Sequence, residues 1–426
     1  MKSSALSQLG KRIEPPSISW LMHAALSKPN LISLAAGFTD NDSLPVSEIR
    51  ESLAEILSSP RRGQAALQYG STQGDVSLRQ LTSRHLARID GELRSAPAYS
   101  PERMIITNGS QQMLYMITEA LCDPDDIVLV EDPTYFVYLG ILQSHGIQAR
   151  GVSMESDGLN LESLESVLES LKQSGELRRV KALYLVTYFQ NPTGTTTAFE
   201  KKIAALKLLK RYERAAGHPI YLLEDAAYRE LRFKGDEVPT ALAIAGGEDR
   251  VIYAGTYSKP FATGTRVGFG ILPEPVFTAV LRIKGNHDFG TSNLLQQLLA
   301  HALKSGRYDQ HLRELRQRYA RKAAVMAGAL RKHFPTSVEW ADPEGGLYFW
   351  AKANGVKTGR RSRLFADALA NEVLYVPGEF CYANDSTRRA PNSEMRISFG
   401  SASELNIRRG IERLGKAIWK NSHGGN

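Results

Sequence analysis

The sequence predicts an α/β protein in which a mainly parallel sheet is flanked by helices, together with a smaller α+β domain. Two observations support this fold class. From about residue 103, short apolar runs alternate with segments of helical periodicity, as in chains that form parallel sheets. From about residue 308, one long charged amphipathic segment is followed by shorter apolar runs. The length of 426 residues also exceeds that of one ordinary domain, which holds roughly 150 residues.

The first region supplies the strands and helices of the main domain. Short apolar runs predict its strands at 104–107, 127–130, 183–187, 220–223, 251–254 and 267–272. Helical periodicity predicts helices at 111–121, 136–145 and 200–216. Gly217 directly follows the last of these helices, at the place where a glycine in the left-handed conformation commonly ends a helix.

The second region supplies the smaller domain. A helix is predicted over 308–333, and short strand-like segments and a last helix follow at 347–351, 374–376, 395–399 and 403–419. We expect the N-terminal residues before about 41 to join this domain. The sequence is therefore divided into an N-terminal arm at 1–45, which forms part of the small domain, a large domain at 46–315 and a small C-terminal domain at 316–426.

The charge of the chain is positive but diffuse. The formal net charge is +8, without a long basic block. The densest basic run, Lys207, Lys210, Arg211 and Arg214, alternates with apolar residues and therefore reads as the polar face of an amphipathic helix. This distribution argues against nucleic acid as a partner. It still favours anionic substrates and a phosphate-bearing cofactor.

Cysteine usage and hydropathy bear on the compartment. Cys122 and Cys381 lie far apart and lack the spacing of a metal site, so we expect no disulfide framework and no metal. A reducing cytosol suits this pattern. The N-terminal residues 1–12 lack the apolar core of a signal peptide, and no stretch approaches the roughly 20 apolar residues that span a bilayer. The expected location is the cytoplasm, without contact with a membrane.

A single lysine follows one of the predicted strands. The segment 253–270 reads YAGTYSKPFATGTRVGFG. Lys259 comes three positions after Thr256, directly after Ser258 and seven positions before Arg266. A desolvated lysine is a neutral nucleophile, and a guanidinium is a planar bidentate donor for a phosphate. The arrangement suits an amine that forms a Schiff base beside a bound phosphate. Taken alone, so short a motif is equally compatible with a surface turn.

Chemically distinctive residues follow four other predicted strands. Because ligands of doubly wound sheets bind beyond the carboxyl ends of the strands, these residues are candidate ligands. In chain order they are Gly109, Ser110 and Gln111, then Tyr135, then Asn191, and finally Asp225 and Tyr228. A helix N-terminus binds anions, an aromatic ring can stack on a flat cofactor, and a buried carboxylate needs a positive partner. Each residue alone also has an ordinary interpretation as an N-cap, a core residue, a turn or a solvated strand end.

Taken together, the motifs resemble those of class I/II aminotransferases, the fold-type I enzymes that use pyridoxal phosphate. The resemblance runs from Ser33-Leu34-Ala35-Ala36-Gly37 to the final helix. It is closest to the 2-aminoadipate and kynurenine aminotransferase branch, through the segments Leu67-Gln68-Tyr69-Gly70, Thr107–Gln112, Phe189–Gly194 and Glu224–Tyr228. The resemblance implies a mainly parallel sheet of the seven-stranded type, with helices on both faces and a smaller second domain.

The resemblance also assigns roles in binding the cofactor. It makes Lys259 the Schiff-base lysine, pairs Asp225 with the pyridine nitrogen, and lets Asn191 and Tyr228 donate to the ring oxygen. Tyr135 would stack on the ring. The phosphate would be held by Arg266, Ser258, Thr256, Ser110, Gln111 and the backbone of Gly109. The family commonly has serine where Thr256 stands, and Pro260 after the lysine is less usual; neither departure removes a required group.

The resemblance assigns the substrate and partner residues as well. Arg396 would grip the α-carboxylate of the substrate as a bidentate fork, beside Gly37 and Asn191. Tyr69 would reach the phosphate of the neighbouring subunit, which makes the expected active unit a homodimer. Trp20 aligns with the position that holds an arginine for an acidic side chain in the aminoadipate-type branch. Packing alone would also explain this tryptophan.

The expected reaction is transamination between an L-amino acid and a 2-oxo acid, with Lys259 as general base and acid. Trp20 favours an aromatic or large aliphatic donor, with 2-oxoglutarate as acceptor. Two alternatives stay open. The same scaffold could support a β-lyase or decarboxylase, or it could be a non-catalytic sensor of the kind found in winged-helix regulators. The region before Ser33 is too short for a DNA-binding domain, which disfavours the sensor.

Overall fold

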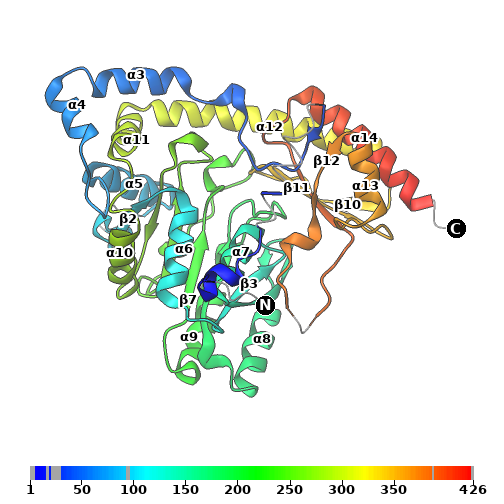
Figure 1. Cartoon of the computed structure of the whole chain (residues 1–426), viewed down its shortest axis with the longest axis horizontal. Coiled ribbons are helices and arrows are strands. Elements are labelled where there is room, and N and C mark those ends of the chain that lie inside the picture. Colours follow the sequence, from blue (N-terminus) through cyan, green and yellow to red (C-terminus); the bar gives the residue numbers. More distant parts are fainter. Residues whose placement is uncertain (1–4, 16–18, 21–29, 93–95, 386–387, 424–426) are drawn as a thin grey trace.

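The computed structural model describes residues 5–15, 19–20, 30–92, 96–385 and 388–423. A central sheet carries helices on both sides, and a second sheet with its own helices lies toward the C-terminal end of the molecule (Figure 1). This is the α/β architecture with a smaller α+β part that the sequence predicts.

The central sheet is mostly parallel. Within the described residues it has eight strands in the order β2 (Met104–Thr107), β9 (Gly268–Ile271), β8 (Val251–Thr256), β7 (Tyr221–Asp225), β6 (Val180–Val186), β3 (Ile127–Asp132), β4 (Gln148–Glu155) and β5 (Gly158–Leu159). Strands β8, β7, β6, β3 and β4 run parallel to one another. Strand β9 runs antiparallel between β8 and β2, and the two-residue β5 is antiparallel to β4. Because helices cover both faces, the inner strands are buried throughout and read as continuous apolar runs.

Strand β4 is the one long strand of this sheet that the hydropathy pattern misses. Its sequence, QARGVSME, is mostly polar, and Val152 is its one residue that is fully buried. The strand lies near the edge of the sheet, where only β5 follows it. A strand in this position buries too little apolar surface to be recognised from a run of apolar residues.

The helices around this sheet are α3 (Val46–Ile56), α4 (Pro60–Leu67), α5 (Val76–Ile89), α6 (Gly109–Leu121), α7 (Phe136–His145), α8 (Leu161–Gln173), α9 (Phe199–Ala216), α10 (Val276–His287) and α11 (Asn293–Ser305). Helices α6, α7 and α9 lie close to the three predicted segments, whereas the other helices around the sheet were not predicted. Helix α9 ends at Gly217, whose φ of 82° is left-handed and whose N–H donates to the carbonyl of Glu213. The glycine cap is therefore confirmed.

The C-terminal part is built on a second sheet. Among the described residues, four antiparallel strands lie in the order β10 (Val338–Trp340), β11 (Tyr348–Ala353), β14 (Glu394–Ser398) and β13 (Val376–Pro377). The helices of this part are α12 (Arg307–His333), α13 (Arg363–Ala370) and α14 (Glu404–His423), and α14 packs along α12 (Figure 1).

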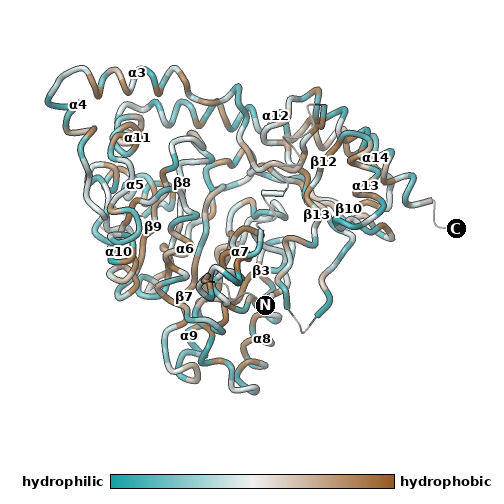
Figure 2. The backbone as a smooth tube through the Cα atoms, in the orientation of Figure 1, coloured by the Kyte–Doolittle hydropathy of each residue, from teal (hydrophilic) through white to brown (hydrophobic). Residues whose placement is uncertain are grey.

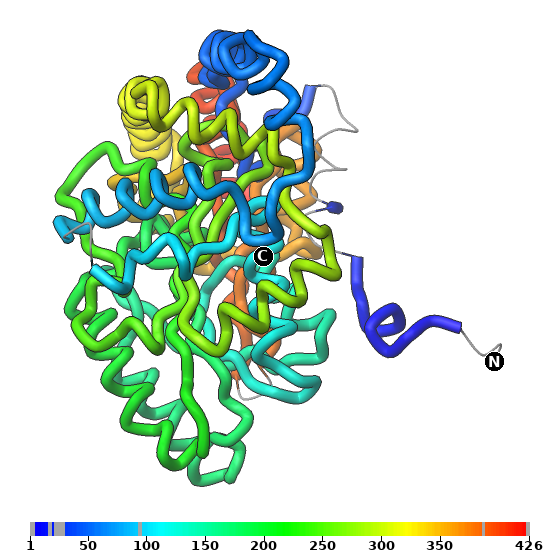
Figure 3. The backbone as a smooth tube through the Cα atoms, turned by 90° about the vertical axis from the view of Figure 1, so that its left-hand side faces the viewer, coloured from blue at the N-terminus to red at the C-terminus, as the bar shows by residue number. Residues whose placement is uncertain are grey.

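The N-terminal segment joins the C-terminal part through a short parallel pair, β1 (Ile32–Ser33) with β12 (Val373–Leu374). The Ser398 N–H also donates to the carbonyl of Leu34 at 2.7 Å. Helix α1 (Gln8–Arg12) lies at the periphery of the molecule, where the Gln143 amide of α7 donates to the Arg12 carbonyl at 2.8 Å (Figure 3). The domain limits at 45/46 and 315/316 stay a prediction.

Apolar residues concentrate in the strands and on the inward faces of the surrounding helices, whereas the outer faces are hydrophilic (Figure 2). Among the residues that the structure describes, no helix is both long enough and apolar enough to cross a membrane.

Candidate active site

The carboxyl ends of the central strands open into one cavity of about 230 Å³. Its lining includes thirteen of the residues singled out in the sequence: Gly37, Gly109, Ser110, Gln111, Tyr135, Asn191, Asp225, Tyr228, Thr256, Ser258, Lys259, Arg266 and Arg396. Two sheets and the N-terminal segment supply these residues. The cavity thus forms where parallel strands end, which is the expected place for a ligand in a doubly wound sheet.

Lys259 follows the end of β8 and is the reactive amine of this cavity. Its Nζ donates to the carbonyl of Gly37 at 2.8 Å. No carboxylate of the described residues forms an ion pair with it. Burial, together with the nearby Arg396 and Arg266 guanidinium groups, lowers the pKa of Lys259 to about 8. At pH 7 roughly a tenth of this amine is therefore neutral and able to act as a nucleophile or base, far more than for an ordinary lysine.

One end of the cavity is built to hold an anion. Helix α6 begins at Gly109, which has a φ of 75°, and no side chain caps its first N–H groups. A Cβ atom at position 109 would lie 2.8 Å from Nη2 of Arg266, so glycine lets the guanidinium approach the helix end. Arg266 Nη1 also donates to the Ser258 hydroxyl at 3.4 Å. Free helical N–H groups, a guanidinium and a hydroxyl together match a phosphate.

The N-cap position of this helix is occupied by Asn108, not by Ser110. The ordinary interpretation of Ser110 as an N-cap is therefore wrong, and Ser110 lines the cavity from the first turn of the helix.

A buried carboxylate marks another side of the cavity. Asp225 is the last residue of β7 and is 3% exposed. It accepts hydrogen bonds from the Tyr184 hydroxyl at 2.9 Å and from the Ala227 N–H at 3.1 Å. Burial raises the pKa of Asp225 to about 6, while these two bonds oppose the rise. Since a buried carboxylate without a cation is costly, Asp225 suits the protonated nitrogen of a heterocyclic ring.

Arg396 is the buried guanidinium of the cavity. It lies on β14, is 1% exposed, and donates to Asn191 Oδ1 at 2.7 Å and to the Ala35 carbonyl at 2.6 Å. Its Nε is buried without a hydrogen-bond partner among the described residues. The ring of Tyr348 lies 4.3 Å from its Cζ atom. A buried cation that lacks a carboxylate partner in the described part of the chain suits the carboxylate of a ligand.

Asn191 connects Arg396 to Tyr228. Its Nδ2 donates to the Tyr228 hydroxyl at 3.2 Å, and that hydroxyl lies 3.0 Å from the hydroxyl of Tyr348. Tyr135 precedes α7 and completes the lining as a flat aromatic side chain. The cavity thus offers an amine, an anion cradle, a carboxylate, hydroxyl donors and an aromatic face. These are the groups that a pyridine ring with an aldehyde, a phenolic oxygen and a phosphate requires.

Two residues assigned from the sequence do not line this cavity. Tyr69 is 82% exposed and packs edge-on against Phe289, with ring centroids 5.4 Å apart. Trp20 packs against Phe365 at 5.7 Å between centroids, and the Arg360 guanidinium lies 4.2 Å over its ring. Their roles toward a neighbouring subunit and a substrate stay predictions.

The structure adds cavity residues that the sequence had not singled out. Tyr348 and Phe136 line the cavity, and Tyr184 supports Asp225 from β6. Tyr348 does not follow a strand of the central sheet, because it is the first residue of β11 in the other sheet, and the strand ends therefore did not indicate it. Its position two residues after Gly345-Gly346 was the available signal.

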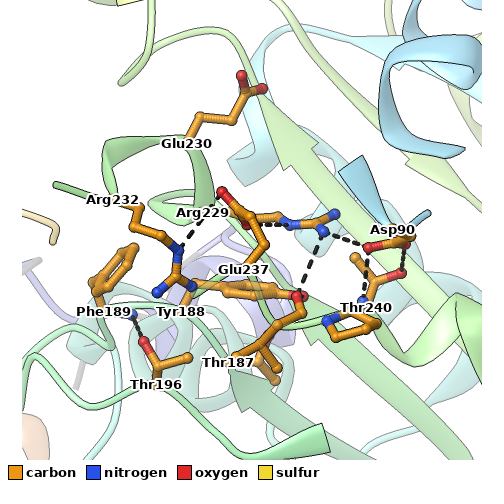
Figure 4. Close-up of polar contacts among 12 residues, drawn as sticks. Asp90, Thr187, Tyr188, Phe189, Thr196, Arg229, Glu230, Arg232, Glu237 and Thr240 are labelled. Carbon is orange, nitrogen blue, oxygen red and sulfur yellow. Dashed lines mark hydrogen bonds and ion pairs between the residues drawn. The ribbon is translucent and has the colours of Figure 1, made fainter. Parts of the chain in front are cut away.

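A cluster of polar contacts surrounds Arg229 and Arg232, which closely follow Tyr228 in the sequence (Figure 4). Arg229 pairs with Asp90, which also accepts a hydrogen bond from the Thr240 hydroxyl at 2.5 Å. Arg232 lies 4.8 Å over the ring of Phe189, two residues before Asn191. The residues on either side of the cavity lining are thereby fixed in place.

Comparison with known proteins decides the family. The sequence profile of aminotransferase class I and II matches residues 29–414. The chain belongs to this family. Aromatic-amino-acid aminotransferase 1 of Thermococcus litoralis is 33% identical over 420 residues, which cover 98% of this chain and 92% of that protein. The 2-aminoadipate transaminase of Thermus thermophilus is 30% identical and is matched over 98% of this chain and 97% of its own length.

Solved structures agree with the family assignment. The kynurenine aminotransferase of Pyrococcus horikoshii superposes with a TM-score of 0.88 at 30% identity, covering 98% of this chain and 97% of its own. The resemblance to the aminoadipate and kynurenine branch of the fold-type I aminotransferases is confirmed. This protein is therefore an enzyme that transfers amino groups, and its cofactor is pyridoxal phosphate.

Proposed function

We propose that this aminotransferase moves the amino group of an L-amino acid with an aromatic or large aliphatic side chain to a 2-oxo acid such as 2-oxoglutarate. The observation that carries the proposal is that two basic side chains, Lys259 and Arg396, line the same cavity. Lys259 has a lowered pKa of about 8 and Arg396 is buried, and neither has a carboxylate partner among the described residues. A substrate that brings a carboxylate to Arg396 places its α-carbon within the same cavity as the base.

The cofactor fits the groups of this cavity. When bound, pyridoxal phosphate supplies an electron-withdrawing ring that makes the α-proton of an amino acid acidic. The α6 N-terminus with Arg266 and Ser258 would hold its phosphate, and Asp225 would hold its ring nitrogen in the protonated form. Asn191 and Tyr228 would face its phenolic oxygen, and Tyr135 its ring.

Lys259 has two tasks in this proposal. Its Nζ is the amine that attaches the cofactor to the chain, and it is the base that removes and returns the α-proton of the substrate. Arg396 orients the α-carbon for that transfer by binding the carboxylate through its guanidinium fork. The bonds from Arg396 to Asn191 and Ala35 fix the guanidinium before the substrate arrives.

Aromatic side chains support the proposed donor class. Tyr135, Phe136, Phe38 and Tyr348 line the cavity, and Phe38 is 46% exposed. The relative named for aromatic amino acids supports this class of donor, whereas two other relatives are named for 2-aminoadipate and for kynurenine with α-aminoadipate. The acceptor is proposed from the reaction class alone.

We further propose that the active unit is a homodimer in the cytoplasm. Tyr69 and Phe289 form an exposed aromatic pair, 82% and 59% exposed. An exposed pair of this size suits burial by a second copy of the chain, where Tyr69 would reach the phosphate of the other subunit. The two cysteines, Cys122 and Cys381, are free thiols, as suits a reducing compartment.

The test is the absorption spectrum of the purified holoenzyme, before and after addition of single amino acids. We expect the band of the bound cofactor to bleach with aromatic and large aliphatic donors and to return when 2-oxoglutarate is added. Faster bleaching by 2-aminoadipate than by phenylalanine or leucine would contradict the proposed donor class. Release of ammonia or carbon dioxide, without a band that a 2-oxo acid restores, would instead favour a β-lyase or decarboxylase.

A further inference from the structure

Tyr348 lies at the point where the two sheets meet in the active site. It is the first residue of β11 and is 1% exposed. A Cβ atom at position 37 would lie 2.6 Å from its hydroxyl oxygen, so the hydroxyl occupies the space that glycine leaves free. Glycine at position 37 thus makes room for the Tyr348 hydroxyl. The only hydrogen-bond partner of this hydroxyl within the described chain is Tyr228, at 3.0 Å.

The hydrogen bonds at Tyr228 restrict where its proton can point. A phenolic hydroxyl has one proton to donate and two lone pairs to accept. Arg396 Nη1 donates to Oδ1 of Asn191, and because a guanidinium cannot accept, the Asn191 amide nitrogen must face Tyr228. One lone pair of Tyr228 is therefore taken by Asn191.

The direction of the hydrogen bond between Tyr228 and Tyr348 decides where the Tyr228 proton points. If Tyr348 donates, both lone pairs of Tyr228 are filled and its proton must point to a third partner in the cavity. If Tyr228 donates instead, its proton is spent on Tyr348. A negatively charged oxygen in the cavity favours the first arrangement, because a hydrogen bond to a charged acceptor is the stronger one.

We propose that Tyr348 is a positioning residue, which donates its hydroxyl proton to Tyr228 and so directs the Tyr228 proton toward the phenolic oxygen of the cofactor. The inference rests on the proposed placement of the cofactor. The proposed role belongs to the Tyr348 hydroxyl and can be tested apart from the packing of its ring. The ring lies 4.3 Å from the Arg396 guanidinium and 5.6 Å from the Tyr228 ring. Burial, with a contribution from Tyr348, raises the pKa of Tyr228 well above its usual value, so Tyr228 keeps a proton to donate.

The experiment is a spectrophotometric pH titration of the holoenzyme and its Tyr348→Phe variant. Phenylalanine keeps the ring beside Arg396 and removes only the donor. A directed proton from Tyr228 stabilises negative charge on the phenolic oxygen and hence the deprotonated chromophore, so its loss raises the pKa of the chromophore. We expect a rise of about half a unit to one unit. The KM for the amino donor should change less than twofold, because the Arg396 fork is intact.

A double-substitution cycle distinguishes positioning from packing. Tyr228→Phe removes the directed proton itself and should shift the pKa of the chromophore at least as far as Tyr348→Phe. In the Tyr228→Phe background, Tyr348→Phe should add no further shift. Tyr375→Phe is the matched control, since Tyr375 is buried and its hydroxyl donates to the Thr358 carbonyl at 2.8 Å, away from the cavity lining. It should leave the pKa of the chromophore unchanged.

Two results would overturn the inference. The first is a Tyr348→Phe holoenzyme with the wild-type pKa of the chromophore, beside a clear shift in Tyr228→Phe. The second is a Tyr348→Phe shift that persists in full in the Tyr228→Phe background. A wild-type chain that pyridoxal phosphate cannot colour would instead contradict the proposed function and would be recognised before any variant is made. Far-ultraviolet circular dichroism of each variant checks that the fold is kept.

Discussion

Two neighbouring carboxylates on β7, Glu224 and Asp225, show how one strand serves two environments. Successive side chains of a strand point to opposite faces of the sheet. Glu224 is 0% exposed and pairs with Lys202 at 2.9 Å, and Thr187 and Ala241 also donate to it. Asp225 accepts from Tyr184 and Ala227 but has no cation partner in the described chain.

The two lysines near these carboxylates differ in the same way. Lys202 is fully buried in α9, and its Nζ contacts Glu224, the Tyr188 hydroxyl at 3.0 Å and the Pro239 carbonyl at 2.8 Å. Lys259 bonds to one carbonyl, that of Gly37. Burial lowers the pKa of both amines, but only at Lys202 does a carboxylate oppose the effect. The ion pair of Lys202 and Glu224, in which each charge has its partner, thus stabilises the fold. Lys259 and Asp225 have no ionic partner in the described chain and remain available for chemistry.

Substitution of the two lysines should separate function from stability, and the largest effect is expected at Lys259. Lys259→Ala should lower turnover by more than about a thousandfold, because it removes both the attachment point and the base. The free energy of unfolding should change by less than about 1 kcal/mol, since only one hydrogen bond to Gly37 is lost. Steady-state kinetics and urea unfolding measure both. Substantial transamination by this variant would disprove the role of Lys259.

Lys202→Ala should have the opposite profile. Removal of the amine leaves Glu224 buried without its cation, which costs about 3–5 kcal/mol of unfolding free energy. The double variant Lys202→Met with Glu224→Gln removes both charges and should be less destabilised than the single one. Urea unfolding of the three proteins is the measurement. Equal stability of Lys202→Ala and the wild type would show that the pair contributes little.

Arg396→Lys sharpens the contrast within the cavity. Lysine keeps the charge but loses the fork that now bridges Asn191 and Ala35, so we expect a loss of about 2–3 kcal/mol, or roughly 30- to 150-fold in kcat/KM for the amino donor. Arg413→Lys is the control, because Arg413 pairs with Glu372 at the surface and lies outside the cavity lining. Similar losses in both variants would argue against a specific grip by Arg396.

The smallest effect is expected at Tyr184, which supports Asp225. Tyr184→Phe removes a hydrogen bond that favours the ionised carboxylate, so the affinity for pyridoxal phosphate should fall about three- to tenfold. Tyr138→Phe is matched to it, because the Tyr138 ring lies 4.0 Å from that of Tyr184 while its hydroxyl contacts Thr118. Fluorescence titration of the apoenzyme with the cofactor measures both. Equal affinities of the two variants would mean that the hydrogen bond from Tyr184 to Asp225 does not contribute to cofactor affinity.

The sequence could predict the elements whose burial leaves a periodic pattern. The buried strands β3, β6, β7 and β8 read as apolar runs, and α7 begins and ends at the predicted residues 136 and 145. Strand β4, next to the edge of the sheet, left no such pattern.

For the site, the chemistry at strand ends was readable because parallel strands bring their carboxyl ends to one edge. Lys259, Asp225 and Asn191 could be found in this way. Tyr348 could not, because it comes from an antiparallel sheet about 90 residues after Lys259 and meets the cavity only through tertiary packing. The sequence also could not show that the Lys202 amine has its full set of polar partners, because these partners come from separate elements of the fold.

The most direct test of this contrast is pulse labelling of the apoenzyme with acetic anhydride over a range of pH, read by mass spectrometry at both lysines. Only a neutral amine reacts, so labelling falls about tenfold per pH unit below the pKa. We predict half-maximal labelling of Lys259 near pH 8, where its lowered pKa lies, and no labelling of Lys202 while the protein is folded. Labelling of Lys259 with the pKa of a free lysine, near 10.4, or equal labelling of both lysines, would contradict the account.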